Sequence, residues 1–174
     1  MSGKKVGIAI GSVLILLLIV GINGYTVKGS ETGIPTPGLA DTAFFAEDPL
    51  PANPVPALVS AKVTVTWSDD DVWLVIVDSD EKNRCDAVPI GLGSSTCSSR
   101  NIDATAGGTE YNNEDGFSWS VEDGEYYAGL GQKDSSAPSS IDVNYSVKLR
   151  ISGLVSVILI GISGACFGFA FTRD

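Results

Sequence analysis

Two uncharged apolar stretches decide the fold of this chain: VGIAIGSVLILLLIVGI at residues 6–22 and ISGLVSVILIGISGACFGFAF at residues 151–171. A helix needs about 20 apolar residues, within a range of about 17–25, to cross the hydrocarbon core of a bilayer. Both stretches meet this requirement. The sequence therefore predicts a membrane protein with transmembrane helices over residues 6–24 and 151–171, short ends at residues 1–5 and 172–174, and one domain between the spans.

The segment between the spans carries the negative charge of the chain. The formal net charge is −10, while the two ends hold Lys4, Lys5 and Arg173 against Asp174. Such a surface repels nucleic acid and attracts cations and basic groups. We therefore expect no nucleic-acid partner.

Basic residues beside the spans predict the orientation, because Lys and Arg resist translocation. Lys4 and Lys5 precede the first span, and Arg173 follows the second. Lys148 and Arg150 lie on the other side of the second span, but the first helix usually dominates the orientation. We expect a two-pass protein of the cell membrane, with both termini in the cytoplasm and the central domain outside it.

A cleaved signal peptide is the alternative interpretation of the first stretch, since a basic segment precedes an apolar core. This core is long for a signal peptide, and Gly21-Ile22-Asn23-Gly24 does not resemble an A-x-A cleavage site. We therefore expect an uncleaved anchor. The central domain lies outside the cytoplasm under either interpretation.

Residues 25–58 are expected to form an extended tether, because proline fixes φ and has no N–H to donate to a sheet. The six prolines of this segment are Pro35, Pro37, Pro49, Pro51, Pro54 and Pro56.

Residues 59–150 show the period-two pattern of β-strands. Apolar and polar side chains alternate over residues 61–67 and 117–121, and residues 72–77 (VWLVIV) are apolar on both faces, which is typical of a central strand. The last strand should turn its apolar side chains inward, namely Val143, Tyr145, Val147 and Leu149.

Turns and loops separate these strands. Asp123-Gly124 predicts a tight hairpin leading into a strand at residues 126–130. Residues 78–86 are expected to form a charged loop, residues 87–90 a weak edge strand, and residues 102–104 a short strand. Short strands with polar turns and no helix predict an all-β antiparallel sandwich, jelly-roll-like, between the two transmembrane helices.

Cys85 and Cys97 are the two cysteines of the central domain. In an oxidising compartment they would form a disulfide that stabilises the domain by about 3 kcal/mol in the chain-entropy model. Two free thiols are the alternative. Cys166, inside the second span, is expected to be a small packing residue.

Acidic side chains after the central strand define a candidate cation site. Asp78, Asp80, Glu81 and Asp86 offer the oxygen ligands that Ca²⁺ prefers. Lys82 stands where a further ligand is needed, and charged runs usually face water. We therefore expect a solvated loop and no cofactor, with Ca²⁺ as the alternative.

Small residues recur at helical spacing in both spans, where they let helix backbones approach closely in lipid. They are Gly7 and Gly11 in the first span, and Gly161, Gly164, Ala165 and Gly168 in the second. We expect these faces to pack on each other or on spans of partner subunits.

Catalytic motifs are missing from the sequence. It contains no histidine, and neither span offers a basic residue that would activate Ser163 as a nucleophile. We expect a protein that is not an enzyme. Asn144-Tyr145-Ser146 is an N-glycosylation sequon on the outward face of its strand, which makes Asn144 a candidate modification site.

Two pieces of the central domain resemble the bacterial and archaeal pre-peptidase C-terminal domain family. The first is Val72-Trp-Leu-Val-Ile-Val-Asp78-Ser-Asp80, and the second is Asp123-Gly-Glu-Tyr-Tyr-Ala128 followed by Tyr145-Ser-Val-Lys-Leu149. Trp73 and Ile76 depart from the family pattern, which often has acids there. The resemblance covers residues 59–150 and implies a β-sandwich that serves as an extracellular accessory or binding module.

Two functional hypotheses follow from these observations. The first is a membrane-anchored binding or adhesion module that contacts a surface ligand through Tyr111, Tyr127 and the loop at residues 91–113, since loops on rigid scaffolds carry function. The second is a structural or accessory subunit of a larger membrane complex. The lipid bilayer is a partner in both.

Overall fold

The computed structural model describes residues 3–86 and 97–172, which form two compact units. The helix unit comprises the described residues within 1–26, 53–61 and 148–174. The sandwich unit comprises residues 27–52 and 62–147.

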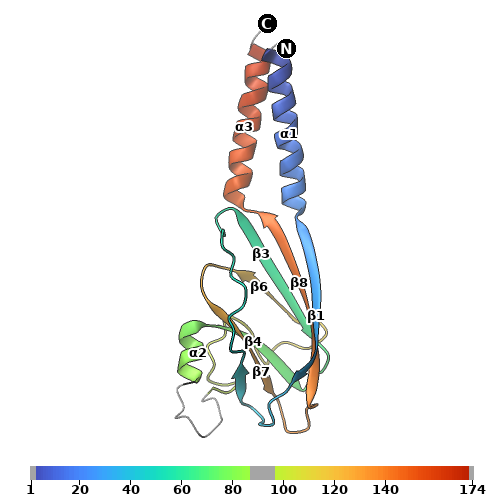
Figure 1. The fold of residues 1–174 in the computed structure, drawn as a ribbon, viewed down its shortest axis with the longest axis vertical. Helices are drawn as coiled ribbons and strands as arrows, with labels where there is room; N and C mark the ends of the chain where they lie inside the picture. Colours follow the sequence, from blue (N-terminus) through green and yellow to red (C-terminus); the bar gives the residue numbers. More distant parts are fainter. Residues whose placement is uncertain (1–2, 87–96, 173–174) are drawn as a thin grey trace. The chain divides into compact units, whose positions relative to one another are not determined.

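The helix unit contains α1 (Gly3–Asn23) and α3 (Gly153–Thr172), which lie side by side (Figure 1). Glycines of α1 permit a close approach. A Cβ atom on Gly7 would lie 3.2 Å from the Cβ atom of Ala170, and one on Gly11 would lie 2.8 Å from the ring of Phe167. Gly7 and Gly11 thus lie in the contact between the helices, both of which are long and apolar enough to span a membrane.

Within the described residues, eight strands form two four-stranded antiparallel sheets, so the expected β-sandwich is confirmed. In the first sheet the order is β1 (Tyr25–Pro35), β8 (Ser140–Ile151), β3 (Val59–Trp67) and β6 (Phe117–Val121). In the second it is β2 (Ala43–Phe45), β7 (Tyr126–Gln132), β4 (Val72–Asp78) and β5 (Ala106–Gly107).

The strand pairing follows one rule. Strand β1 pairs with β8, β2 with β7, β3 with β6, and β4 with β5. A long hairpin gives this pattern when its paired strands alternate between two sheets, which is the jelly-roll arrangement.

Strand β4 is buried on both faces, as its apolar sequence predicts. It lies between β7 and β5, with Val75 opposite both Gly129 and Gly107. One face of β4 contributes to the cluster between the sheets, whose buried members are Trp67, Val72, Ile76, Phe117, Trp119 and Ile141. The other face contributes to a second cluster, made of Ala43, Trp73, Val75, Val77, Cys85 and Cys97.

The segment predicted to be a tether contains two strands instead. Strands β1 and β2 both lie within residues 25–58. The first proline of the segment is Pro35, which ends β1, and no proline lies within β2. The prolines therefore occupy the strand end and the connections, where a missing N–H costs no ladder hydrogen bond.

The Asp123–Gly124 turn does not close a hairpin, contrary to the prediction. Strands β6 and β7 belong to different sheets, so this turn carries the chain from one sheet to the other. Gly124 has φ = +143°, a conformation that favours glycine. The dipeptide therefore indicated a turn correctly but not which strands pair.

Three further predictions concern the last strand and two short strands. Leu149 is 36% exposed and belongs to the helix unit rather than the sandwich unit, whereas Val143, Tyr145 and Val147 are partly buried as expected. The strand predicted at residues 102–104 is replaced by β5, a few residues later. The predicted edge strand at residues 87–90 lies outside the described residues.

The contact between α1 and α3 predicts a specific cross-link. In a Cys166→Ala background, a Gly7→Cys and Ala170→Cys pair should form a disulfide within one chain, since side chains at these positions meet at a Cβ separation close to that of natural disulfides. Intact mass and resistance to alkylation measure it. A Gly7→Cys and Gly164→Cys pair is the control and should stay reduced. Equal cross-linking of both pairs would contradict this helix contact.

Candidate binding surface around the disulfide and Tyr111

Helix α2 (Ser79–Cys85) replaces the charged loop expected at residues 78–86, so the expectation of no helix in the central domain was wrong. Asp78 caps the helix, because its carboxylate accepts a hydrogen bond of 2.8 Å from the N–H of Glu81. Acidic residues occupy the first turn and basic residues the last, which suits the helix dipole. Asp78 followed three residues later by Glu81 is the sequence pattern of a capped helix start. The sequence therefore does indicate that a helix begins here.

Glu81 is the buried charge of this region, with 8% of its surface exposed. Arg84 donates two hydrogen bonds to its carboxylate, at 2.7 Å from Nε and 2.6 Å from Nη2. The backbone N–H of Asp103 donates a third, at 2.7 Å. These bonds lower the pKa of Glu81, the Arg84 bonds most, against the opposing effect of burial. The carboxylate is therefore held ionised, and it ties α2 to the chain after Cys97.

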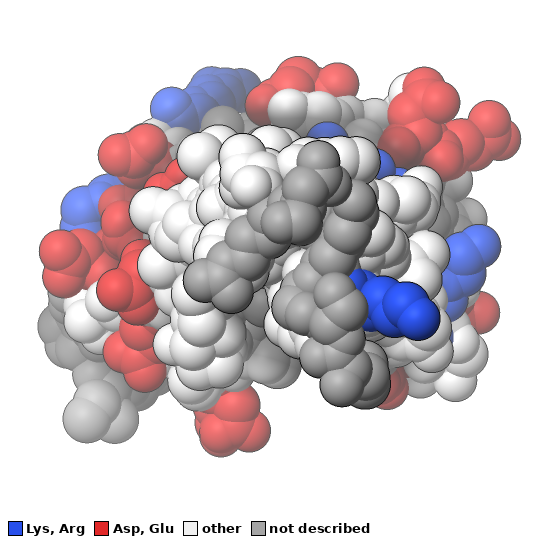
Figure 2. Space-filling view, turned by 90° about the horizontal axis from the view of Figure 1, so that it is seen from above, with Lys and Arg blue, Asp and Glu red and all other residues white. Residues whose placement is uncertain are grey.

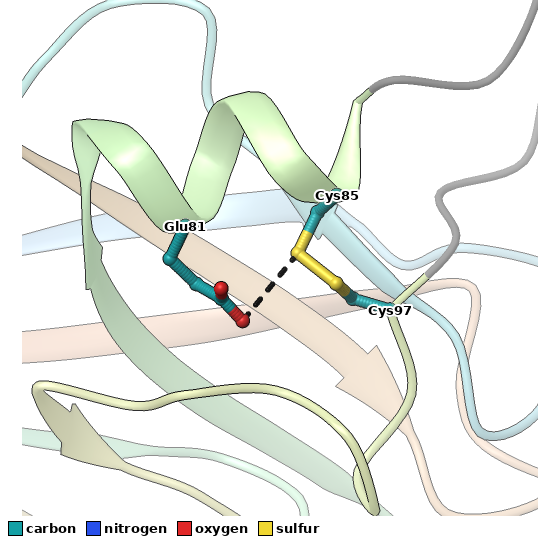
Figure 3. Close-up of side chains that lie close together, drawn as sticks. All are labelled: Glu81, Cys85 and Cys97. Atoms are coloured by element: carbon teal, nitrogen blue, oxygen red, sulfur yellow. Dashed lines mark hydrogen bonds between the residues drawn. A yellow bond between two sulfur atoms is a disulfide. The ribbon is translucent and has the colours of Figure 1, made fainter.

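Cys85 and Cys97 form the predicted disulfide, so the alternative of two free thiols is excluded. Figure 3 shows the Glu81 carboxylate directed toward it, with Oε1 at 3.8 Å from the Cys85 sulfur. These three residues bring potential metal ligands within 4.8 Å of one another. A metal binds the thiolate form of cysteine, however, and both sulfurs here are used in the disulfide. The group is thus better explained as the contact between α2 and the disulfide.

Residues 97–103 are fixed at several further points. The N–H of Ala43 in β2 donates to the carbonyl of Cys97 at 2.9 Å, and Arg84 Nη2 donates to the carbonyl of Asn101 at 2.7 Å. Asp41 accepts from the N–H of Ser99 at 3.2 Å. This segment therefore lies firmly on the second apolar cluster. Asp41, Arg84 and Asp103 carry no recognisable motif, so the sequence alone does not indicate their role.

The chain continues into a compact turn at residues 108–116, which we call the Tyr111 turn. It begins where the N–H of Gly108 donates to the Leu74 carbonyl of β4, at 2.8 Å. Asn112 then closes it, because its side chain accepts from the N–H of Asp115 and donates to the Asp115 carboxylate. Gly116 has φ = +59°, and a Cβ atom there would collide with the carbonyl of Val65. Only glycine fits this close approach.

Tyr111 is the exposed aromatic side chain of this turn, with 38% of its surface accessible. Its ring is tilted against that of Phe117, with 5.8 Å between centroids. Phe117 is buried in the cluster between the sheets, so a rigid core residue supports the ring of Tyr111. Carboxylates of Glu110, Glu114 and Asp115 surround it in sequence.

Tyr127 lies in a different environment, against the cluster that holds the disulfide. The ammonium group of Lys82 lies 4.9 Å from its ring centroid. The pKa of Tyr127 is raised, first by burial and then by the Glu125 carboxylate. The two tyrosines proposed as ligand contacts are thus supported by different clusters. The loop proposed with them is described from residue 97 onward only.

The four acidic residues of the candidate cation site have separate surroundings. Asp78 caps α2, Glu81 is bonded to Arg84, and Asp86 forms an ion pair of 2.7 Å with Lys82, while Asp80 is exposed on the helix. Among the described residues they form no group of converging ligands. Figure 2 shows Asp and Glu side chains in several separate groups, with Lys and Arg between them.

The remaining predicted residues fall into two sets. Asn144 is exposed on β8, as its sequon requires. In α3, a Cβ atom on Gly161, Gly164 or Gly168 would meet nothing within 4 Å, so these glycines do not face α1. Ala165 is also exposed.

No protein-family model matches this sequence, and no curated protein is similar to it. Among solved structures, a periplasmic inhibitor of g-type lysozyme from Aeromonas hydrophila has 18% sequence identity over 74% of this chain and 86% of its own, with a TM-score of 0.27.

The bonds of Glu81 predict a pH-dependent contribution to stability. The Glu81→Gln variant should lose about 1–3 kcal/mol of unfolding free energy at pH 7, because a buried charge-assisted network is broken. The pKa of Glu81 is lowered by folding, so this contribution is present above the unfolded value of about 4.3 and is lost as the pH falls through the folded value. Denaturant unfolding of the full chain in detergent, followed by tryptophan fluorescence, measures both effects.

The matched control is Asp80→Asn, which removes the same charge from an exposed position of α2. It should change the unfolding free energy by less than about 0.5 kcal/mol. A loss that is the same in both variants, or that persists unchanged at pH 3, would show that the Glu81 network does not have this role.

Proposed function

We propose that this protein is a membrane-anchored recognition module, whose extracytoplasmic jelly-roll domain binds a surface ligand without catalysing a reaction. The single observation that carries the proposal is the Tyr111 turn: an accessible aromatic ring on a rigid loop, supported from below by the core residue Phe117. Loops held by a rigid scaffold are where binding residues concentrate. The earlier resemblance to pre-peptidase C-terminal domains implies the same kind of accessory function.

The exposure of the helices supports membrane anchoring. Only 6% of the apolar window in α1 and 11% of that in α3 are buried, whereas the core helix of a soluble protein would be mostly buried. Their exposed side chains include Leu16, Val20 and Val157. Helices that are apolar all round require either a protein core or lipid around them, and lipid is the partner that fits two such helices.

The sidedness of the proposal rests on charge and redox chemistry. Lys4 and Lys5 favour a cytoplasmic N-terminus, and two spans then return the C-terminus to the same side. The disulfide between Cys85 and Cys97 suits an oxidising compartment. Both considerations support an extracytoplasmic sandwich.

The chemistry of the Tyr111 turn suggests the class of ligand. A tyrosine ring presents an apolar face together with a hydroxyl group, and this combination suits sugars and mixed polar surfaces. The neighbouring carboxylates Glu110, Glu114 and Asp115 accept hydrogen bonds and attract positive charge. We therefore expect a polymer that offers hydroxyl or amino groups, such as a neutral or amino polysaccharide, rather than an anionic one.

Binding of immobilised polysaccharides tests this function directly. The full chain in detergent should bind a neutral or amino polysaccharide more tightly than a sulfated one. Tyr111→Ala should weaken that binding about tenfold or more, equivalent to about 1.4 kcal/mol, whereas Tyr111→Phe should retain most of it. The control is Leu39→Ala, which removes another exposed apolar side chain of the sandwich unit. Equal binding by all variants would count against the Tyr111 turn as the contact surface.

The open glycines of α3 favour a second function, as a subunit of a larger membrane complex. Gly161, Gly164 and Gly168 lie on the face of α3 that α1 does not cover, and small residues spaced four apart allow close helix packing in lipid. This face would bind the span of a partner protein, and the sandwich would then act within the assembly.

Purification from native membranes in mild detergent distinguishes the two functions. If the protein is a complex subunit, a partner should co-purify in a fixed ratio, and Gly164→Leu should release it by blocking the approach of the partner helix. The Ile162→Leu variant is the control, because it changes an exposed side chain of the same helix without adding bulk at a glycine. A lone chain in both variants would favour the recognition module.

A further inference from the structure

An exposed apolar turn lies in the helix unit, at the start of α3. It comprises residues 54–58 (PVPAL), all of which are exposed. Val55 and Leu58 are 43% and 51% accessible. The surrounding chain from Pro49 to Ala61 contains no charged residue, although the protein is strongly acidic. These residues belong to the segment predicted to be a tether, and the function proposed above gives the turn no role.

The turn is attached to the first residues of α3 through Ser152. The N–H of Ser152 donates to the carbonyl of Leu58 at 2.8 Å. The hydroxyl of the same serine accepts from the N–H of Val155 at 3.3 Å, which caps the helix. Ser152 thus holds Leu58 close to the first residue of α3.

Several backbone groups of the turn form hydrogen bonds within it or with Asn53. The N–H groups of Leu58 and Val59 donate to the carbonyl of Val55, and the N–H of Val55 donates to the side chain of Asn53. Asn53 is buried, and its amide also donates to the carbonyl of Val59 at 2.7 Å. Pro54 and Pro56 have no N–H to satisfy. The turn therefore presents apolar side chains while most of its backbone positions carry either a bonded N–H or none, which lowers the cost of a poorly hydrated environment.

We propose that residues 54–58 insert into the interfacial layer of the bilayer, beside the point where α3 enters the hydrocarbon core. The proposal rests on the membrane anchoring proposed above. Continuity with the span supports lipid as the occupant, since Ser152 joins the turn directly to Gly153, the first residue of α3. Charge supports it as well, because Lys148 and Arg150 lie in the same unit, just before the span, where they complement lipid phosphates.

Site-specific fluorescence in liposomes tests this insertion. In a Cys166→Ala background, an environment-sensitive dye is attached to Leu58→Cys, and lipids with a spin label at a shallow or a deep position act as quenchers. An interfacial segment lies about 5–10 Å into the boundary between headgroups and acyl chains. The dye at position 58 should therefore emit at shorter wavelength than in water and lose more intensity to the shallow quencher than to the deep one. Val55→Cys should behave in the same way.

Two reference positions distinguish a failure of the interfacial insertion from a failure of the membrane anchoring. Val13→Cys, at an exposed position near the middle of α1, should be quenched best by the deep label. Leu39→Cys, at an equally exposed apolar position of the sandwich unit, calibrates the dye in water. If position 58 behaves like position 39 while position 13 is quenched, the interfacial insertion is wrong and the spans stand. If position 58 is blue-shifted but not quenched by either lipid, a protein covers the turn and the proposal also fails. If position 13 is not quenched, the membrane anchoring itself is wrong.

Discussion

The burial of β4 on both faces is the constraint on which the rest of the sandwich depends. Val72 and Ile76 are enclosed between the sheets, but Trp73, Val75 and Val77 point to the outer face of their sheet and need a cover of their own. Cys85 and Cys97 belong to the cluster that buries these side chains. Helix α2 and the segment after Cys97 therefore pack on the outer face of this sheet. The position of the Tyr111 turn follows, because its first residue is hydrogen-bonded to β4.

Electrostatics then fixes this cover in one arrangement. A carboxylate with 8% exposure is costly to bury unless it is paired and hydrogen-bonded. Glu81 meets both conditions, through Arg84 on its own helix and the Asp103 N–H from the distant segment. Breaking either bond would leave a buried charge without full compensation. These hydrogen bonds therefore hold α2 and the segment after Cys97 in one arrangement. The disulfide next to them limits how far α2 and that segment can separate.

Local pattern in the sequence predicted the central strands of the sandwich but not their pairing, and it missed β1, β2 and α2. The alternation of Phe117, Trp119 and Val121, and the two apolar faces of β4, matched the structure because each strand has its own burial period. Asp123-Gly124 misled, since a turn signal is local while the choice of sheet is set by the whole jelly roll. The predicted tether was wrong for a related reason: its prolines lie at the end of β1 and in the connections before and after β2, so they say nothing of the strands between them. Arg84 and Asp103 could not be found from sequence, because only the fold brings them to Glu81.

The two candidate functions use different exposed surfaces. A complex subunit would use the open glycines of α3, and a recognition module would use Tyr111. The contact of α1 with α3 uses Gly7 and Gly11, and it leaves Gly161, Gly164 and Gly168 of α3 open. Lipid satisfies such a face without cost, because there is no hydrophobic driving force between helices in a bilayer. The open glycines thus permit a partner span but do not require one. An exposed tyrosine supported by a rigid core is different, because its position is maintained by the glycines and hydrogen bonds of a well-ordered turn. This asymmetry is why we propose recognition by the sandwich ahead of assembly with a partner span.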